Sequence, residues 1–318
     1  MSEETKNAEV KAEIEAAEDA SVVEAAEAPE TVAASAATAK ATDAAEGEPD
    51  EPTPIIFLDN VKVTFKTRTG SILHPNKVQA VKGLTLKLMP GETIGIVGES
   101  GCGKSTTANV MCGLQAPTEG RVFFKGKDVT KRTAADRRTI GRVISVVFQD
   151  PATALNARMT VHDQLMDPMI VHKVGTPAER EARVHDLIGM VGLPESCLEA
   201  LPGQMSGGQR QRVAIARALA LNPDAIIADE PTSALDVSVR AQILNLLMDL
   251  KKELGLAMVF ISHDIQTVRY ISDRIIVMNG GLAVEEGTAE QVFNNPKDDY
   301  TRLLLGAAPS LLHPDLGK

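Results

Sequence analysis

The chain has 318 residues, of which 43% are hydrophobic and 3% aromatic, and its formal net charge is −10. This length allows two average domains, or one large α/β domain with a tail. The three cysteines lie far apart without C-x-x-C spacing, which argues against a disulfide framework and against a zinc or iron–sulfur site.

We expect neither a secretory signal nor a membrane-spanning segment. Residues 1–30 lack a basic start followed by an apolar stretch. No apolar run approaches the ~18 residues that indicate a transmembrane helix. The sequence therefore predicts a cytosolic chain that does not itself cross a membrane.

The negative charge is concentrated at the start of the chain. Residues 1–54 contain fifteen Asp or Glu and three Lys, and are otherwise mostly Ala, Thr, Ser and Pro. Such a segment has too little apolar surface to offset the entropy cost of ordering, so residues 1–53 are predicted to be a disordered acidic tail. The remaining 28 acidic and 30 basic residues make the rest of the chain nearly neutral. Net charge therefore indicates nothing about its ligand.

The first predicted strand of interest, 93–97, runs into a glycine-rich loop, 98–105, and then into a helix. The loop matches G-x-x-x-x-G-K-[ST], whose backbone N–H groups and helix N-terminus bind phosphates. A dinucleotide fingerprint does not fit, because Thr106 stands where it requires Gly or Ala. Lys104 is expected to neutralise the β- and γ-phosphates, and Ser105 to offer its hydroxyl to Mg²⁺. The residues expected at the nucleotide are Gly98, Ser100, Gly101, Cys102, Gly103, Lys104, Ser105 and Thr106.

Polar residues follow three further predicted strands. Strand 145–148 leads into Gln149, and strand 257–261 leads into His263 after one serine. A lone Gln or His at a strand end usually only meets solvent, and the other five histidines are assigned to structural or exposed positions. These two are different, because ligands of α/β sheets bind at the carboxyl ends of the strands.

The third of these strands, 225–228, ends in a pair of carboxylates. Asp229 and Glu230 are adjacent, and neighbouring residues of a strand point to opposite faces. We therefore expect different roles, with Asp229 holding Mg²⁺ and Glu230 activating the attacking water as general base.

A second helix start also suits phosphate. Ser206 and Gln209 have the spacing of a capping box at the start of helix 207–219, and Gly207 and Gly208 leave room for close approach to its backbone. The chain already has one complete phosphate loop. We therefore expect this helix to contact nucleotide held by another copy or by a sister subunit.

In this order, the motifs resemble those of the ATP-binding subunits of ABC transporters. The resemblance covers residues 55–318 and implies a glutamine loop at Gln149, a Ser-Gly-Gly-Gln signature at 206–209, a loop ending at Asp236, and a switch histidine at His263. It also implies Mg²⁺ ligation by Ser105, Gln149 and Asp229, and catalytic roles for Lys104, Gln149, Glu230 and His263. Phe65 best matches the aromatic that stacks on adenine, although it could instead fill a core edge.

Several strings resemble the oligopeptide and dipeptide importer branch, among them 148–151, 234–239, 284–287 and 300–304. One departure is Asp298-Asp299-Tyr300, where this branch usually has His-Pro-Tyr. The alternatives are the same ATPase role for a nickel chelate or glutathione, and an ABC ATPase that transports no solute.

The resemblance implies an α/β P-loop NTPase with a RecA-like core, an antiparallel β-subdomain and an α-helical subdomain. We place this ATP-binding domain at 54–318 and the helical subdomain at about 150–206. ATP and Mg²⁺ are the implied ligands. The implied partners are transmembrane permease subunits, an identical or sister ATP-binding subunit and, indirectly, an extracellular solute-binding protein, with no nucleic acid. The implied location is the cytoplasmic face of the cell membrane.

Overall fold

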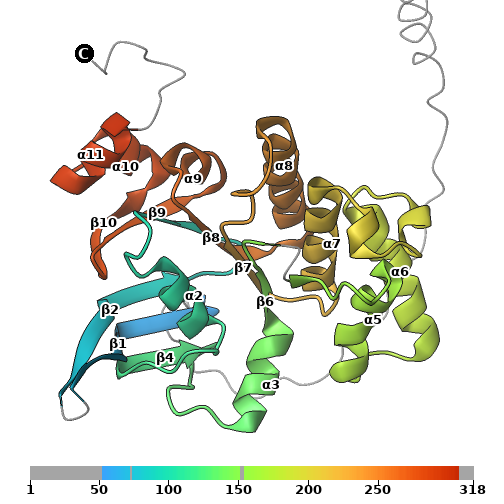
Figure 1. Cartoon of the computed structure of the whole chain (residues 1–318), viewed down its shortest axis with the longest axis horizontal. Coiled ribbons are helices and arrows are strands. Elements are labelled where there is room, and N and C mark those ends of the chain that lie inside the picture. The colour runs from blue at the N-terminus through green and yellow to red at the C-terminus, as the bar shows by residue number, and fades with distance from the viewer. Residues whose placement is uncertain (1–51, 72–73, 151–153, 308–318) are drawn as a thin grey trace, which may run out of the picture. The chain divides into compact units, whose positions relative to one another are not determined.

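The computed structural model describes residues 52–71, 74–150 and 154–307. In this part of the chain the strands form two sheets, one of six strands and one of four, and both are visible in Figure 1. Nearly all of the predicted acidic tail, residues 1–51, lies outside the described residues. The domain boundary near residue 54 therefore stays a prediction.

The six-stranded sheet has the order β10-β9-β3-β8-β7-β6. Its strands from β9 to β6 are parallel, and β10 pairs with β9 in the antiparallel direction. The strands are β3 (Thr93–Val97), β6 (Ile144–Val147), β7 (Ala225–Asp229), β8 (Ala257–Ser262), β9 (Arg274–Asn279) and β10 (Leu282–Thr288). All four predicted strands are present, and the largest shift of a boundary is one residue.

The four-stranded sheet is antiparallel and has the order β2-β1-β4-β5. Its strands are β1 (Ile56–Ser71), β2 (His74–Leu88), β4 (Glu119–Phe124) and β5 (Lys127–Asp128). Helix α2 (Lys104–Met111), which follows the glycine-rich loop, contacts both β1 and β2 of this sheet and β7 of the other. The expected antiparallel β-subdomain is therefore confirmed.

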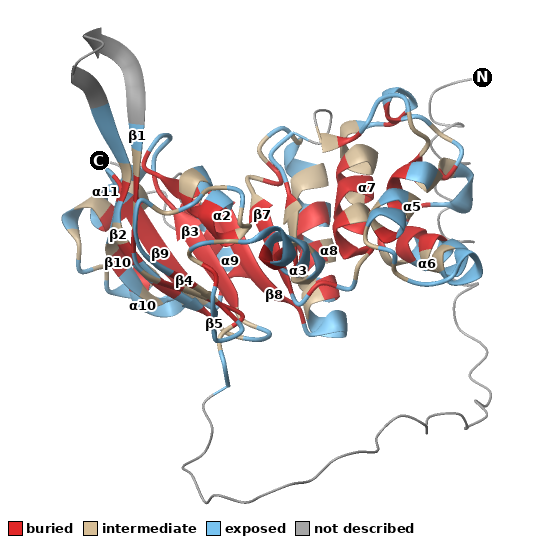
Figure 2. Ribbon diagram, turned by 90° about the horizontal axis from the view of Figure 1, so that it is seen from below, coloured by how far each residue is buried: buried red, intermediate tan, exposed pale blue. Residues whose placement is uncertain are grey.

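Alternation along the parallel strands creates two cores. In β8, Val259 and Ile261 belong to a cluster shared with the antiparallel sheet and α2, while Met258 and Phe260 belong to a cluster shared with the helices on the other face. Successive residues of a strand point to opposite faces, so a strand buried on both sides is apolar throughout. Figure 2 shows this as continuous burial through the middle of the sheet.

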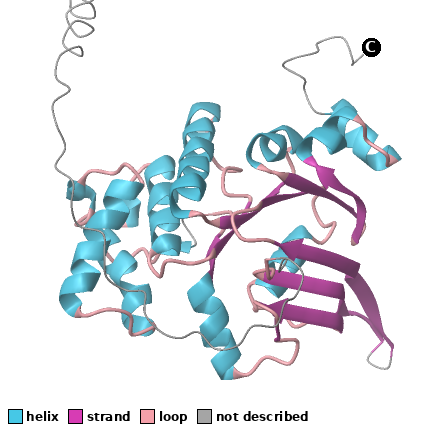
Figure 3. Cartoon of the chain, turned by 180° about the vertical axis from the view of Figure 1, so that it is seen from behind, coloured by secondary structure: helices cyan, strands magenta, loops and turns pink. Residues whose placement is uncertain are grey.

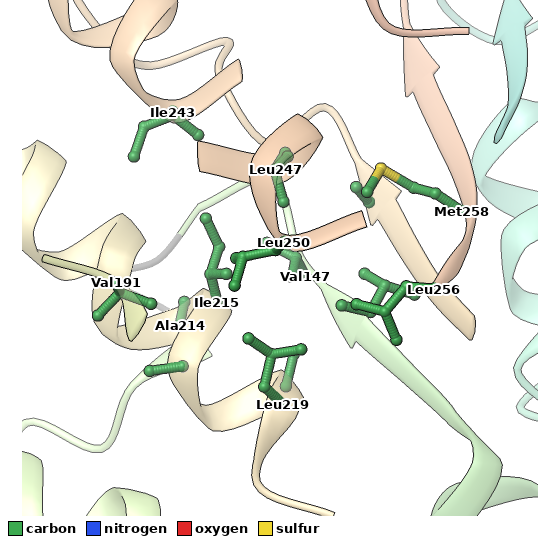
Figure 4. Packing of buried hydrophobic residues seen from close by; sticks show 14 of the residues in the cluster. Val147, Val191, Ala214, Ile215, Leu219, Ile243, Leu247, Leu250, Leu256 and Met258 are labelled. Carbon is green, nitrogen blue, oxygen red and sulfur yellow. The ribbon is translucent and has the colours of Figure 1, made fainter. Parts of the chain in front are cut away.

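The helices on the second face close that core. Ile215 and Leu219 of α7 (Gly207–Leu219) and Leu247 of α8 (Val237–Leu254) are buried in one cluster with Val147 and Met258 of the sheet (Figure 4). The remaining helices are α3 (Ala134–Val143), α5 (Val161–Val171), α6 (Pro177–Met190), α9 (Ile265–Ile271), α10 (Ala289–Asn294) and α11 (Asp299–Ala307), with short 3-10 turns at Glu195–Cys197 and Pro202–Gln204.

Helices α5, α6 and α7 pack against one another and stand apart from the antiparallel sheet (Figure 3). This arrangement agrees with an α-helical subdomain beside an α/β core, although its exact limits stay a prediction. Within the described residues, no helix combines the length and the apolarity required to span a lipid bilayer.

Strand β3 packs closely against α9 at Gly95, which leaves no room for a side chain there. A Cβ added at Gly95 would lie 2.2 Å from Val268 Cγ1 and 2.4 Å from Ser272 Oγ. Gly95→Ala should therefore cost about 1–3 kcal/mol by overpacking, seen as a lower urea midpoint. The control is Gly189→Ala in α6, where a Cβ would meet nothing within 4 Å, and where alanine should stabilise the helix by about 0.5–1 kcal/mol. A Gly95→Ala midpoint at or above the parental one would contradict this account.

Candidate functional site

The glycine-rich loop adopts a shape that only glycine permits at two close contacts. Gly103 has φ 108°, and a Cβ there would lie 2.3 Å from the carbonyl oxygen of Ala80. A Cβ at Gly98 would lie 2.1 Å from the carbonyl oxygen of Met278. The loop is thus wedged between β2 and β9 by contacts with no room for a side chain. Its N–H groups and the start of α2 are held there as a preformed cradle for an anion.

Lys104 begins α2 and is turned back onto the loop. Its side chain is buried, and Nζ donates to the carbonyl oxygens of Gly98 at 2.7 Å and Glu99 at 3.0 Å. A buried ammonium needs such partners, because desolvating it without them is costly. The cation predicted to meet phosphate is therefore present in the loop and already desolvated.

Asp229 is the last residue of β7 and lies opposite the start of α2. Burial raises the pKa of its carboxyl, while a hydrogen bond from Ser105 acts in the opposite direction. Among the described residues, no hydrogen-bond partner reaches its buried Oδ1. A buried carboxylate oxygen that lacks a partner, next to a hydroxyl, suits a divalent cation with oxygen ligands. The residues present therefore fit the expected Mg²⁺.

Glu230 lies at the centre of a polar group at the sheet edge. Gln149 Nε2 donates to Glu230 Oε2 at 3.3 Å, and His263 Nδ1 lies 3.2 Å from the same oxygen. The three residues follow β6, β7 and β8, whose parallel register brings their carboxyl ends together. The predicted convergence of Gln149, Glu230 and His263 is thus what the structure contains.

The sequence predicts that Asp229 and Glu230 point to opposite faces, because neighbouring residues of a strand alternate. The structure gives a different reason for their different directions. Strand β7 ends at Asp229, and Glu230 has left the strand with φ 48°. A positive φ is uncommon in residues other than glycine and concentrates at functional sites. The N–H of Glu230 still donates to Ile261 of β8 at 2.9 Å. Glu230 is therefore aimed by a left-handed turn and not by strand alternation.

A cavity of about 270 Å³ connects these groups. The lining residues are Ala80, Ser100, Gly101, Gly103, Lys104, Ser105, Thr106, Gln149 and Glu230. It thus joins the phosphate loop to the predicted general base. Asp229 and His263 are next to this lining through Ser105 and Glu230.

The predicted signature is formed but does not line this cavity. Ser206 Oγ accepts from the N–H of Gln209 at 3.2 Å and Gln209 Oε1 accepts from the N–H of Ser206 at 2.9 Å, as the capping box requires. Gly208 faces α8, where a Cβ would lie 2.7 Å from Val239 Cγ1, and a Cβ on Gly207 would lie 3.5 Å from Leu235. Asp236 occupies the N-cap position of α8 without a capping hydrogen bond to its side chain, and is exposed. None of the described residues that line the cavity comes from the signature.

Phe65 does not line the cavity, but it lies on the strand that pairs with β2, which does. Phe65 lies on β1, is 40% exposed, and is paired across the strands with Val78 of β2. Val78 is two residues before Ala80, which lines the cavity. An exposed aromatic near the cavity suits a stacking surface for a base, and this role stays a prediction. Sequence reasoning did not find Ala80, because β2 carries no motif and reaches the loop only through tertiary packing.

Comparisons with known proteins agree with this geometry. The ABC transporter family profile matches residues 81–233, which include the phosphate loop, the signature and the Asp229-Glu230 pair. The dipeptide transport ATP-binding protein DppF of Haemophilus influenzae is 42% identical over 83% of this chain and 81% of its own. The oligopeptide transport ATP-binding protein AppF of Bacillus subtilis is 45% identical over 80% of this chain and 78% of its own.

Among solved structures, a dimeric post-hydrolysis state of the ATP-binding cassette MJ0796 bound to ADP and Pi superimposes with a TM-score of 0.66. It is 35% identical and covers 74% of this chain and 98% of its own. The chain belongs to the ATP-binding subunits of ABC transporters. Within that family it falls in the branch of oligopeptide and dipeptide subunits, as the sequence motifs indicate.

One variable position of the ABC phosphate loop is a cysteine that points inward. Cys102 is 5% exposed and packs against Gly98, where an added Cβ would lie 2.8 Å from Sγ. Burial raises the pKa of the Cys102 thiol. It also raises the pKa of Cys112, in the turn after α2, to about 12. The reactive form is the thiolate, which exists only above the pKa, so both cysteines are protected at neutral pH.

We therefore predict that Cys102 and Cys112 of the native ABC subunit react with Ellman's reagent at pH 8 at least roughly tenfold more slowly than in urea, because their raised pKa values keep the thiolate fraction low and Cys102 is also buried. Cys102→Ala should lose one equivalent from the slow phase only. Cys197, which is partly exposed, is the internal comparison. Rapid modification of Cys102 in the native chain would contradict the buried placement.

Proposed function

We propose that this ABC subunit hydrolyses ATP at composite sites shared with a second ATP-binding subunit, and thereby energises import of oligopeptides or dipeptides. The observation that carries the proposal is the split between two phosphate-binding helix starts. One lies at the cavity with Gln149 and Glu230, and the other, Ser206–Gln209, lies outside it. A complete site then needs the signature helix of another copy or of a sister subunit.

The phosphate loop would bind the triphosphate. Gly101, Gly103 and Ser105 of the loop line the cavity, and Lys104 would exchange two carbonyl partners for phosphate oxygens. Thr106 lines the cavity beside Ser105 and would contact the nucleotide from the first turn of α2. Phe65 would stack on the adenine.

Ser105, Gln149 and Asp229 would hold Mg²⁺. These residues would thereby place positive charge beside the phosphates, which would offset the negative charge that develops there. The protein's contribution is the donor set itself, namely a hydroxyl, an amide and a carboxylate whose buried Oδ1 has no hydrogen-bond partner among the described residues. Asp229 supplies the charge that such a site requires.

Glu230 would act as general base. Its carboxylate is aimed at the cavity, and its Oε2 contacts both Gln149 and His263. Two neighbours on one carboxylate oxygen fix the rotamer and leave the second oxygen to accept a proton from water. His263, which is largely exposed, is free to contact the γ-phosphate at the face where a partner would close.

Transport requires that ATP-driven closure reach a channel. We assign the coupling to the helical subdomain, which is joined to the core through the segment that starts at Gln149. Closed and open states must differ in their affinity for ATP, because otherwise nucleotide could not shift the equilibrium between them. The partners would be permease subunits, with an extracellular solute-binding protein acting indirectly. The subunit would then be a peripheral protein on the cytoplasmic face of the membrane.

The names of the relatives favour peptide as the solute. DppF of Haemophilus influenzae is named for dipeptide transport and AppF of Bacillus subtilis for oligopeptide transport. A soluble ABC ATPase without a transport role finds no comparable support in the observations on this chain.

The general base is tested by Glu230→Gln, which keeps size and hydrogen bonding but cannot take a proton. We expect ATP binding to be retained and turnover to fall by on the order of a hundredfold or more. The variant should also accumulate ATP-bound dimers in gel filtration, because ATP at the interface is not consumed. In vesicles reconstituted with the permease subunits, labelled peptide uptake should stop as well. Parental ATP hydrolysis by Glu230→Gln would remove Glu230 from this role.

The composite site is tested by mixing two inactive variants. Lys104→Ala lacks the lysine of the phosphate loop, and Ser206→Arg places a bulky side chain at the exposed start of the signature helix, so each dimer of one variant has two defective sites. A mixed dimer regains one complete site, and an equal mixture should recover about a quarter of parental activity. Neither variant should be active alone. Full activity of a monomeric Ser206→Arg preparation would overturn the shared site.

A further inference from the structure

A tyrosine from the end of the described chain contacts the phosphate loop. The backbone N–H of Glu99 donates to the hydroxyl of Tyr300 at 3.0 Å, across a separation of 201 residues. Tyr300 lies in the first turn of α11 and packs, partly buried, against the core cluster on the helical face of the sheet. Burial raises the pKa of its hydroxyl. The contact therefore joins the C-terminal helix directly to the nucleotide site.

The contact gives the peptide unit between Gly98 and Glu99 a hydrogen-bond partner at both its carbonyl and its N–H group. Lys104 Nζ donates to the carbonyl of Gly98, and the N–H of Glu99 in the same peptide donates to Tyr300. The next carbonyl, that of Glu99, accepts from Lys104 at 3.0 Å and from the N–H of Cys102 at 3.3 Å. Both partners of this peptide unit are thus side chains, and one of them is the lysine expected to move to phosphate.

Tyr300 is itself held in place by a buried carboxylate. Glu285 of β10 is 9% exposed and accepts from the N–H groups of Lys297 at 2.8 Å and Asp298 at 3.0 Å. Asp298 in turn accepts from the N–H of Tyr300 at 2.9 Å. Burial alone would raise the pKa of Glu285, but the hydrogen bonds that reach its carboxylate lower it. The segment before α11 is thereby fixed to the sheet.

We propose that Tyr300 is a positioning residue for ATP binding, which keeps the phosphate loop in shape when Lys104 leaves the carbonyls of Gly98 and Glu99. This inference rests on the proposed function, because it assumes that the loop binds the phosphates. The physical reason is preorganisation: a loop that stays ordered without its lysine need not be reordered by the ligand. Glu285 acts one step behind, through Asp298.

Tyr300→Phe tests the proposal, because it removes one oxygen atom and leaves the ring packing intact. Loss of one such hydrogen bond should weaken binding of a fluorescent ATP analogue by on the order of threefold to tenfold. KM for ATP should rise by a similar factor while kcat at saturation stays near the parental value. A merely structural role would lower both the urea midpoint and kcat without this split.

The matched control is Tyr270→Phe. Tyr270 is the other tyrosine of the chain, and its hydroxyl donates to Asn245 at 2.9 Å on an exposed surface of α8 and α9. The same oxygen is removed, yet ATP affinity should not change. Unchanged affinity in Tyr300→Phe, or an equal loss in both variants, would overturn the role of Tyr300.

Glu285→Gln tests the link behind Tyr300. The two carboxylate oxygens of Glu285 each accept one N–H group, and glutamine replaces one of these oxygens with an NH₂ group that cannot accept. This variant should therefore also weaken ATP binding. Because both residues act through one contact, the double variant should bind about as weakly as Tyr300→Phe alone. Strictly additive losses would show that Glu285 does not act through Tyr300. A parental chain that binds no ATP would instead refute the proposed function, and this inference with it.

Discussion

Hydrogen-bond register among four parallel strands is the constraint on which the site depends. The loop after β3, Gln149 after β6, the carboxylates at the end of β7 and His263 after β8 belong to segments far apart in sequence. They meet because parallel strands in register end at one edge. A shift of one residue in β7 would exchange the side chains that its two faces contribute to the two apolar clusters and disturb the packing of both. The core thus sets the geometry of the chemistry.

The two helix starts that suit phosphate lie in different places. The cavity is lined by Lys104 and Glu230, and Asp229 adjoins it through Ser105, all from the α/β core. The second phosphate-binding helix start is fully formed, with both hydrogen bonds of its capping box, yet its glycines pack toward α8. A motif built so completely but placed away from the cavity is best understood as serving nucleotide held by another subunit.

Much of this could be predicted from sequence because the signals are local. The phosphate loop, the capping box at Ser206 and the apolar strands depend on residue types at fixed spacing, and these elements were found within one residue. Three features could not be predicted. Ala80 reaches the cavity through the pairing of β2, Glu230 owes its direction to a positive φ, and Tyr300 contacts Glu99 only through tertiary packing. None of these has a pattern in the linear sequence.

The position of Lys104 has a consequence for discrimination among anions. Two backbone carbonyls accept hydrogen bonds from its ammonium group, so a ligand must replace these partners to bind the lysine. A small ion such as inorganic phosphate can make only a few contacts to compensate for the loss of both hydrogen bonds of Lys104. A polyphosphate can also engage the row of N–H groups along the loop, so that its gain exceeds the loss. The two carbonyl oxygens therefore compete with a ligand for Lys104, and this competition favours a polyphosphate over a small anion.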